Sequence, residues 1–95
     1  MPVVRKNEAA SRYELLLDDG VTVAGFADYV LEGARVRLPH TVVHAQFQGQ
    51  GLAALLAQAA LRDIEAAGLC VTPECSYIEA YIRRHPQWQA LRCAD

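Results

Sequence analysis

The amino-acid sequence predicts an α+β fold, in which an antiparallel three-strand meander, a β-α-β crossover and a C-terminal helix share one mixed sheet. Three observations predict it. Residues 13–47 contain three extended stretches between short turns, residues 52–67 contain neither glycine nor proline, and a short apolar stretch at 69–72 precedes a second helical segment. Strands joined by tight turns pair antiparallel, and a strand that returns through a helix runs parallel to its predecessor.

The first two strands are delimited by the turns that follow them. Tyr13–Leu17 is a short strand closed by Asp18-Asp19-Gly20, a strong turn sequence. Val21–Leu31 is a longer strand, after which Glu32-Gly33 turns the chain again. Residues 1–11 are polar, and we expect them to be loosely ordered.

The third strand, Arg35–Phe47, is rich in β-branched and apolar residues but contains Pro39-His40. A proline cannot donate a hydrogen bond to a sheet ladder, so Pro39 indicates an edge position or a bulge. The strand ends at a glycine-containing turn, which leads into the first helix.

The helix predicted over Leu52–Ala67 is rich in alanine and leucine, the best helix formers. Gly68 is suited to end it. One face of the helix is apolar, as packing on a sheet requires, and the opposite face is polar. The apolar face comprises Leu52, Leu55, Leu56, Ala59 and Ala60; Asp63 also falls on this side, where no pattern explains it.

The C-terminal third is predicted to hold a short strand and a helix. Leu69–Thr72 is the strand, ended by Pro73 and parallel to the third strand through a right-handed crossover. Ser76 is predicted to cap a helix over Tyr77–Arg84, with Glu79 completing a capping box. Pro86 ends this helix, and residues 88–92 add a last turn.

Composition limits the classes of function. The 95 residues, 53% of them hydrophobic, are those of one globular domain, and the net charge of −2 gives no reason to expect nucleic acid or an anionic membrane as a partner. No apolar run approaches the roughly 20 residues of a membrane span, and the start has no signal-peptide pattern. We therefore expect a cytoplasmic protein whose three cysteines are free thiols. A zinc site is not expected, because four converging ligands are not apparent.

The most informative segment is Gln48-Gly49-Gln50-Gly51-Leu52-Ala53, at the junction of an extended stretch and a helix. Glycines let the backbone approach a ligand closely, and the first turn of a helix offers free N–H groups at the positive end of its dipole. The segment therefore predicts a phosphate-binding turn. The alternative is a plain strand-to-helix turn.

These residues, in this order of elements, resemble the GNAT N-acetyltransferase superfamily. Its acetyl-CoA motif is Gln or Arg, two residues, Gly, one residue, then Gly or Ala, and residues 48–53 match it in full. Pro73-Glu74-Cys75-Ser76-Tyr77 and Tyr81-Ile82-Arg83-Arg84-His85-Pro86 are similar to a subgroup of very short, stand-alone GNAT-like proteins. The resemblance covers residues 12–92, and residues 1–95 are expected to form a single minimal domain of this kind.

Two residues depart from the subgroup pattern. An acidic residue usual two positions after the histidine matching His40 is replaced by Val42, which puts a carboxylate base in doubt, and Ser76 replaces a common proline. The N-terminal helices that help form the acceptor site of full-length GNAT enzymes are also missing from so short a chain.

The resemblance implies an acetyl-CoA-dependent N-acetyltransferase, with acetyl-CoA as cosubstrate. Backbone N–H groups of residues 48–53 would hold the pyrophosphate, with Gln50 or Arg83 adding contacts, and a backbone N–H along Val42–Ala45 would polarise the thioester carbonyl. The candidate cofactor-binding residues are Val43, His44, Gln48, Gly49, Gln50, Gly51, Leu52, Ala53 and Arg83.

Four side chains are candidates for the chemistry. Tyr81 matches the helix tyrosine that faces the CoA sulfur in many GNAT enzymes, although it and Tyr77 can equally form the buried face of a short helix. Cys75, near a helix N-terminus, could accept the acetyl group, line the pocket, or be a buried apolar residue. His40 and His44 could each act as a base or be structural.

The acceptor amine, on a protein or a small molecule, cannot be identified from the sequence, and neither can the oligomeric state. A non-catalytic acyl-CoA-binding or protein-interaction module is the alternative function.

Overall fold

The computed structural model describes residues 2–94, which form two small sheets, two α-helices and two 3-10 turns. β1 (Val3–Asn7), β2 (Arg12–Leu16), β3 (Val23–Asp28) and β6 (Thr41–Val43) make a four-stranded antiparallel sheet in that order. β4 (Val30–Glu32), β5 (Arg35–Leu38) and β7 (Cys70–Pro73) make the second sheet, in which β5 and β7 are parallel. The expected α+β class, meander and parallel crossover are confirmed.

The two sheets share two long, bent segments of chain, which the sequence had predicted as single strands. The stretch predicted as Val21–Leu31 is divided at Tyr29 into β3 and β4, and the stretch predicted as Arg35–Phe47 is divided at Pro39-His40 into β5 and β6. The proline does mark a break, as predicted. Because the bend moves the chain from one sheet to the other, β5 pairs with β7 whereas β6 pairs with β3.

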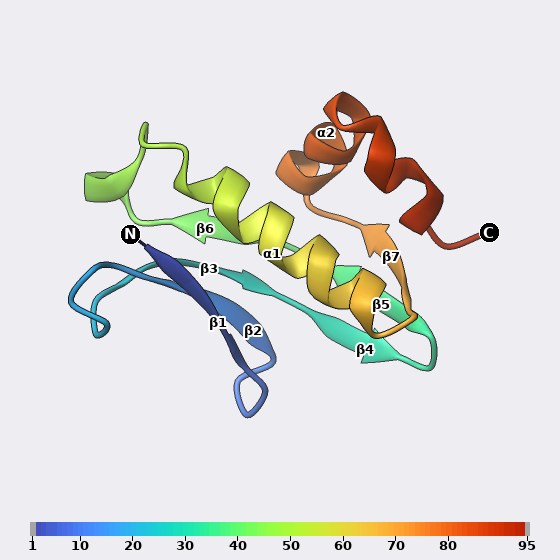
Figure 1. The fold of residues 1–95 in the computed structure, drawn as a ribbon, viewed down its shortest axis with the longest axis horizontal. Coiled ribbons are helices and arrows are strands. Elements are labelled where there is room, and N and C mark those ends of the chain that lie inside the picture. Colours follow the sequence, from blue (N-terminus) through green and yellow to red (C-terminus); the bar gives the residue numbers. More distant parts are fainter. Residues whose placement is uncertain (1, 95) are drawn as a thin grey trace.

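α1 (Leu52–Ala66) crosses one face of both sheets, and α2 (Ser76–Arg84) stands beside the end of β7 (Figure 1). The two faces of α1 serve different parts of the core. Leu52, Leu56 and Ala60 pack on β2 and β3, while Ala57, Leu61 and Ile64 pack with β5, β7 and α2. Leu55, expected on the apolar face, is 38% exposed. Gly68, at φ 72°, ends α1 as predicted.

The prediction that residues 1–11 are loose is wrong for β1, which pairs along its whole length with β2. Its polar residues find partners far along the chain. Arg5 and Asn7 donate to Glu14, and Lys6 Nζ lies 2.9 Å from Asp63 Oδ2. Tyr13 also donates to Asp63 (2.8 Å), which explains a carboxylate on the inner side of α1.

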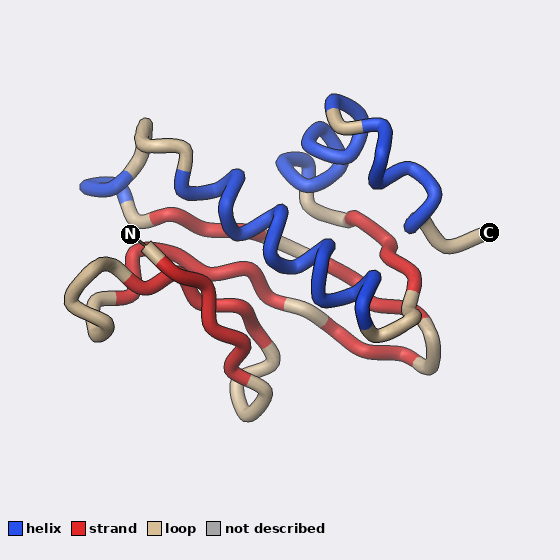
Figure 2. The backbone as a smooth tube through the Cα atoms, viewed as in Figure 1, coloured by secondary structure: helices blue, strands red, loops and turns tan. Residues whose placement is uncertain are grey.

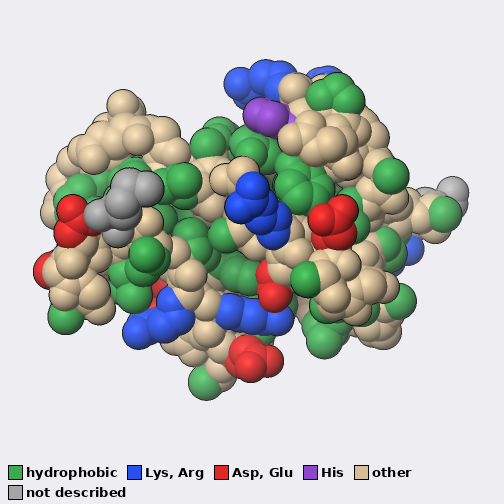
Figure 3. Space-filling model, in the orientation of Figure 1, with side chains coloured by type: hydrophobic (Ala, Val, Ile, Leu, Met, Phe, Trp, Pro, Cys, Tyr) green, Lys and Arg blue, Asp and Glu red, His purple; other side chains and the backbone are tan. Residues whose placement is uncertain are grey.

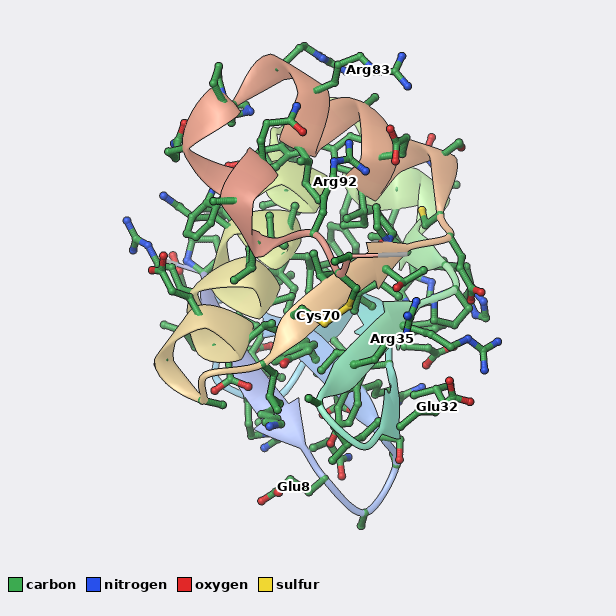
Figure 4. All side chains as sticks on the ribbon, turned by 90° about the vertical axis from the view of Figure 1, so that its right-hand side faces the viewer. Glu8, Glu32, Arg35, Cys70, Arg83 and Arg92 are labelled. Atoms are coloured by element: carbon green, nitrogen blue, oxygen red, sulfur yellow. A yellow bond between two sulfur atoms is a disulfide. The ribbon has the colours of Figure 1, made fainter. Side chains whose placement is uncertain are left out.

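Two predictions about the C-terminal third are also wrong. Cys75, not Ser76, is the N-cap of α2 and makes no side-chain cap, while the Glu79 carboxylate binds Arg92 instead of closing a capping box. Cys70 and Cys93 form a disulfide, so only Cys75 of the three cysteines is a free thiol (Figure 4). The two cysteines are separated by 23 residues in the sequence, so no local pattern indicates the pairing. In the fold, η2 (Pro86–Leu91) brings Cys93 back beside β7.

No helix in the part of the chain that the structure describes is long and apolar enough to span a membrane.

Candidate functional site

A groove of about 350 Å³ lies between β6, the glycine turn and the start of α2. We call it the groove, and the residues that line it are Thr41, Val43, Phe47, Gln48, Gly49, Gly51, Leu52, Ala53 and Tyr77. None of these side chains carries a charge. In the view of Figure 3 the surface between the turn and α2 is likewise hydrophobic or uncharged.

The groove exists because two neighbouring segments part. The β5–β7 ladder runs from Arg35↔Cys70 to Leu38↔Pro73. Beyond it the chain bends at Pro39-His40 and β6 continues toward the glycine turn, while β7 leads into α2 (Figure 2). Such a separation is what the predicted polarisation of a carbonyl by a main-chain N–H requires.

The edge of β6 that faces away from β3 carries main-chain groups directed at the groove. In an antiparallel ladder successive residues point their N–H and C=O groups to opposite edges. His44 N–H donates to Ala24 O (2.8 Å), so Val43 points the other way, and its carbonyl accepts from Gln48 Nε2 (3.1 Å). Among residues 2–94 no strand pairs with this edge.

Gly25 allows β6 to lie this close to β3. A Cβ at Gly25 would lie 2.5 Å from Val42 O and 3.1 Å from Val43 Cα, which a folded backbone does not tolerate. Gly25 was not among the residues predicted for the site. Its signal was a glycine inside a strand pattern, which indicates a close approach of two backbones.

The glycine turn leads into α1 without a cap. A short 3-10 turn, η1 (Ala45–Phe47), replaces the predicted end of the third strand, and Gly49 (φ 83°) and Gly51 (φ 73°) then take left-handed conformations. Gly51 is the N-cap of α1, with no side-chain cap and no acidic residue in the first turn. A Cβ at either glycine would meet nothing within 4 Å, so both positions border open space.

These features fit the requirements of coenzyme A. Free N–H groups and a helix dipole suit a diphosphate, an uncharged slot suits a long apolar-amide arm, and unpaired main-chain groups of β6 suit its amides. Thr41, which lines the groove, has a buried Oγ1 with no hydrogen-bond partner within the described chain.

Cys75 does not line the groove; it directly precedes α2 and lies two residues before Tyr77, which does. Its N–H donates to Leu38 O (2.9 Å), and its side chain is buried with the core residues of α1 and α2. Burial disfavours its thiolate, but the N–H of Ile78, the Thr41 hydroxyl and the N–H of Tyr77 outweigh burial, so the pKa of the thiol is lowered.

The tyrosines of α2 stack in order from the groove. Tyr77 lines the groove, Tyr81 lies behind it with ring centroids 6.4 Å apart, and His85 stacks on Tyr81 at 4.0 Å. Burial raises the pKa of Tyr77. Tyr81 does not line the groove, so its role as an acid stays a prediction, and Tyr77, which the sequence analysis treated mainly as a core residue, is the tyrosine at the groove wall.

The two histidines are exposed on the opposite face of the sheet. The rings of His40 and His44 lie 6.3 and 6.5 Å from that of Phe26, and His40 Nε2 is 2.5 Å from Asp28 Oδ2. They flank Phe26 on the same face, but neither side chain lines the groove.

Two other predicted residues lie outside the groove. Gln50 lines a shallow depression with Asp18 and Asp19, not the groove itself. Arg83, whose side chain is 71% exposed, pairs with Glu79 (3.1 Å) and points away from the molecule (Figure 4). Over residues 2–94 no three His, Cys, Asp or Glu side chains gather as metal ligands.

Comparisons with known proteins bear on the family and the fold. Residues 12–91 match the family model described as GCN5-related N-acetyl-transferase. A search of curated proteins gave no significant match. Among solved structures, a GCN5-like protein from Staphylococcus aureus aligns with a TM-score of 0.72 at 17% identity, covering 97% of this chain and 88% of its own.

A second solved structure, the ribosomal-protein-S18-alanine N-acetyltransferase from Escherichia coli, aligns with a TM-score of 0.65 at 18% identity. It covers 78% of this chain, which spans half of that enzyme's length. At these identities the two structures show the fold alone. Together with the family model, which matches most of the sequence, they lead to one conclusion: this chain belongs to the GCN5-related N-acetyltransferase family.

Proposed function

We propose that this protein is an acetyl-CoA-dependent N-acetyltransferase that acts on the amine of a protein or a small molecule. One observation carries the proposal: an uncapped helix N-terminus, two left-handed glycines and an unpaired strand edge border the same uncharged groove. In this assignment the main-chain N–H groups of residues 49–53 hold the diphosphate of acetyl-CoA, since the Gln48 N–H donates to Ala45 O (3.3 Å).

The thioester carbonyl would be polarised by the main chain of β6. Val43 directs its backbone groups at the groove, whereas His44 N–H is used by Ala24. We therefore assign the polarising N–H to Val43. A main-chain donor directed at the developing oxyanion lowers the barrier of acyl transfer. Gln50 and Arg83 lie outside the groove lining, so any contact from them would be to the part of the cofactor that projects from it.

Cys75 and a tyrosine of α2 are assigned the proton and acyl chemistry. The lowered pKa of Cys75 favours a thiolate that could accept the acetyl group. Tyr77 lines the groove and Tyr81 stacks behind it, so we assign protonation of the departing CoA thiolate to this pair. His40 and His44 could act as bases only toward an amine that approaches from the opposite face of the sheet.

The acceptor amine is open in this proposal. The E. coli structural neighbour is named for a ribosomal protein alanine, and this supports including peptide N-termini beside small amines in any acceptor panel. The proposal places the protein in the cytoplasm, where thiols are reduced. Assays with and without a reductant therefore cover both states of Cys70 and Cys93.

A second candidate, a non-catalytic acyl-CoA-binding module, is favoured by one observation. No acidic, basic or histidine side chain lines the groove, so the proton of the acceptor amine has no evident base there. The two candidates share cofactor binding and differ in turnover.

The first experiment is calorimetric titration of the protein with CoA and with acetyl-CoA. Gly51→Asp places a carboxylate at the diphosphate position, and we expect it to weaken binding at least about tenfold, which corresponds to about 1.4 kcal/mol. Gly33→Asp is the matched control, because Gly33 is also left-handed (φ 61°) and borders open space, in the β4–β5 turn. Equal binding by both variants would remove the support for the proposal.

The second experiment separates enzyme from binding module. CoA release is followed over a panel of amines and peptides, with intact mass recorded for the protein itself. Enzymatic activity predicts turnover that falls in Cys75→Ser or Tyr77→Phe while CoA affinity is kept. CoA binding without turnover on any acceptor, and without acetylation of the protein, would favour the module.

A further inference from the structure

The floor of the groove and its α1 wall come from a part of the chain that is nearly free of titratable side chains. Between Thr41 and Leu61, which covers β6, the glycine turn and most of α1, His44 is the only one. Its ring is exposed beside Phe26 and does not line the groove. The first charged residue of α1 is Arg62, in the C-terminal half of the helix, whereas the groove lies at its start.

The acidic side chains of the elements that build or support the groove are used elsewhere. Most of them are paired with basic side chains, and Glu65 is exposed near the C-terminal end of α1. The pairs are Asp28 with His40, Asp63 with Lys6 (2.9 Å), Glu74 with Arg37 (3.1 Å), and Glu79 with both Arg83 (3.1 Å) and Arg92 (2.8 Å). A molecule in the groove therefore meets no carboxylate of residues 2–94.

The titratable groups of α2 do not supply a base either. Tyr77 lines the groove, but burial raises the pKa of its hydroxyl, so near neutral pH it can donate a proton and not accept one. His85, at the other end of α2, stacks on Tyr81, and its Nδ1 lies 2.8 Å from Tyr81 O. Cys75 does not line the groove.

Both helices begin at the groove, and this adds an electrostatic preference. Gly51 is the N-cap of α1, whose first turn holds no acidic residue, and Tyr77 belongs to the first turn of α2. The positive ends of helix dipoles stabilise anions and disfavour cations. A protonated amine that enters an uncharged slot also loses hydration without gaining a counter-ion. The groove therefore suits a developing oxyanion or thiolate and disfavours an ammonium group.

We propose that the acceptor is an amine that is already neutral near pH 7, as the α-amine of a peptide is in part, and not the ammonium of a lysine side chain or a polyamine. The inference rests on the proposed function, whose acceptor it narrows. The neutral nitrogen attacks the acetyl carbon, so that a C–N bond forms and the C–S bond of the thioester breaks. The nitrogen gives up one proton and the departing sulfur takes one up, through Tyr77 or water.

The size of the preference follows from the ordinary pKa values of the two amines, about 7.7–8 for an α-amine and about 10.4 for lysine. At pH 7 about one α-amine in eight is neutral, against about one lysine in 2,500, a ratio of roughly 300. The more basic amine is also the better nucleophile, which returns part of this factor. We therefore expect a preference of at least about tenfold for the α-amine.

The test compares two peptides of the same length and composition. One has a free N-terminus and a blocked lysine, and the other has a blocked N-terminus and a free lysine. CoA release at saturating acetyl-CoA gives kcat/KM for each peptide from about pH 6 to about pH 10. The α-amine peptide should be preferred at least about tenfold at pH 7 and level off near about pH 8, while the lysine peptide rises about tenfold per pH unit.

Equal or faster reaction of the lysine peptide at pH 7 would overturn the proposal. So would a plateau that begins near about pH 6.5 with either peptide, because it would report a base on the protein.

A variant that adds a carboxylate to the groove tests the cause of the preference. Gln48 lines the groove, and its Nε2 lies 3.1 Å from Val43 O, beside the main-chain N–H assigned to the thioester carbonyl. Gln48→Glu should lower the preference for the α-amine by at least about fivefold. Gln46→Glu, an exposed residue of η1 outside the groove lining, is the matched control and should keep it within about twofold. Equal preferences in the two variants would contradict the proposal.

Failure of this inference differs from failure of the proposed function. CoA release with the lysine peptide preferred removes the inference and leaves an acetyltransferase. No CoA release with either peptide removes the proposed enzyme, and the inference with it.

Discussion

The groove and the open face of the four-stranded sheet treat their polar groups in opposite ways. The open face, opposite α1, carries Glu14, whose carboxylate is 4% exposed and accepts from Arg5, Asn7 and Arg12. In the groove, the Thr41 hydroxyl has no hydrogen-bond partner within residues 2–94, and α1 begins without a side-chain cap. One face uses its polar groups for folding, whereas the other, in the proposed function, leaves them for a ligand.

This difference indicates where stability and function reside. Saturated groups contribute to the free energy of unfolding, and unsaturated groups reduce it but can bind. Changes on the open face should therefore alter stability and spare binding, and changes in the groove should do the reverse. The changes below test this division, from the largest expected effect to the smallest.

The largest effect on stability should come from removing the disulfide that ties the C-terminal segment to β7. The Cys70–Cys93 disulfide closes a loop between two residues 23 positions apart, and this loop contains α2. Loss of the disulfide should lower the free energy of unfolding by about 3 kcal/mol. The double change Cys70→Ser/Cys93→Ser avoids a stray thiol and is compared with the oxidised parent by denaturant unfolding. CoA affinity should change by less than about twofold, because the bidentate Glu79–Arg92 pair still holds the C-terminal segment.

An unchanged midpoint in this double variant would mean that the disulfide adds nothing to stability. A large loss of CoA binding would instead show that the position of α2 beside the groove depends on the disulfide.

Glu14→Gln should lower stability by about 2 kcal/mol at pH 7 and leave CoA affinity unchanged. The hydrogen bond from Arg5, with those from Arg12 and Asn7, outweighs burial and lowers the pKa of Glu14 to about 2. Because the folded pKa lies below the unfolded one, the contribution is complete above the ordinary pKa and is lost as the pH falls through about 2. Urea unfolding of parent and variant at several pH values measures it.

The difference between parent and Glu14→Gln is the informative quantity, because Glu79, whose pKa is also lowered to about 2 by Arg92 and Arg83, titrates in both proteins. A difference that stays constant between pH 7 and pH 2 would contradict the assignment to the Glu14 carboxylate.

Gly25→Ala should affect both regions, because Gly25 joins β3 to the strand that lines the groove. A methyl group 2.5 Å from Val42 O forces β6 to move, which should cost about 1–3 kcal/mol and weaken CoA binding severalfold. Calorimetry and unfolding measure the two effects. Gly20→Ala is the control: it strains a left-handed turn residue in open space, so only stability should fall.

The smallest effect is expected from Gln48→Ala, which removes the hydrogen bond from Gln48 Nε2 to Val43 O. Since Gln48 is exposed, stability should change by less than about 1 kcal/mol. CoA affinity should fall more than it does in Gln46→Ala, an exposed control on η1. Equal affinities of the two variants would show that Gln48 does not organise the strand edge.

Several elements could be read directly from local patterns. α1 was predicted to within one residue at its C-terminal end, because alanine and leucine without glycine or proline favour a helix in any surroundings. Gly49 and Gly51 indicated a special turn because only glycine adopts positive φ without cost. The parallel crossover to β7 followed from the handedness rule of β-α-β units.

Other elements depended on contacts between distant residues. β1 forms from a polar sequence because Arg5, Lys6 and Asn7 bind carboxylates of β2 and α1. Pro39 indicated a break, but the transfer of the chain to a second sheet depends on which strand is available to pair. His40 and His44 were candidate bases, but only the folded sheet shows that both lie beside Phe26, away from the groove.

The sequence by itself determined the glycine turn, the long helix behind it and the family, because each depends on residues adjacent in the chain. Only the tertiary structure decided that Cys75 is a buried free thiol, that Tyr77 rather than Tyr81 lines the groove, and that Cys70 pairs with Cys93. The physical reason is the range of the interactions involved. Backbone propensity acts within a few residues, whereas burial, hydrogen bonding and disulfide formation act between groups that only the folded chain brings together.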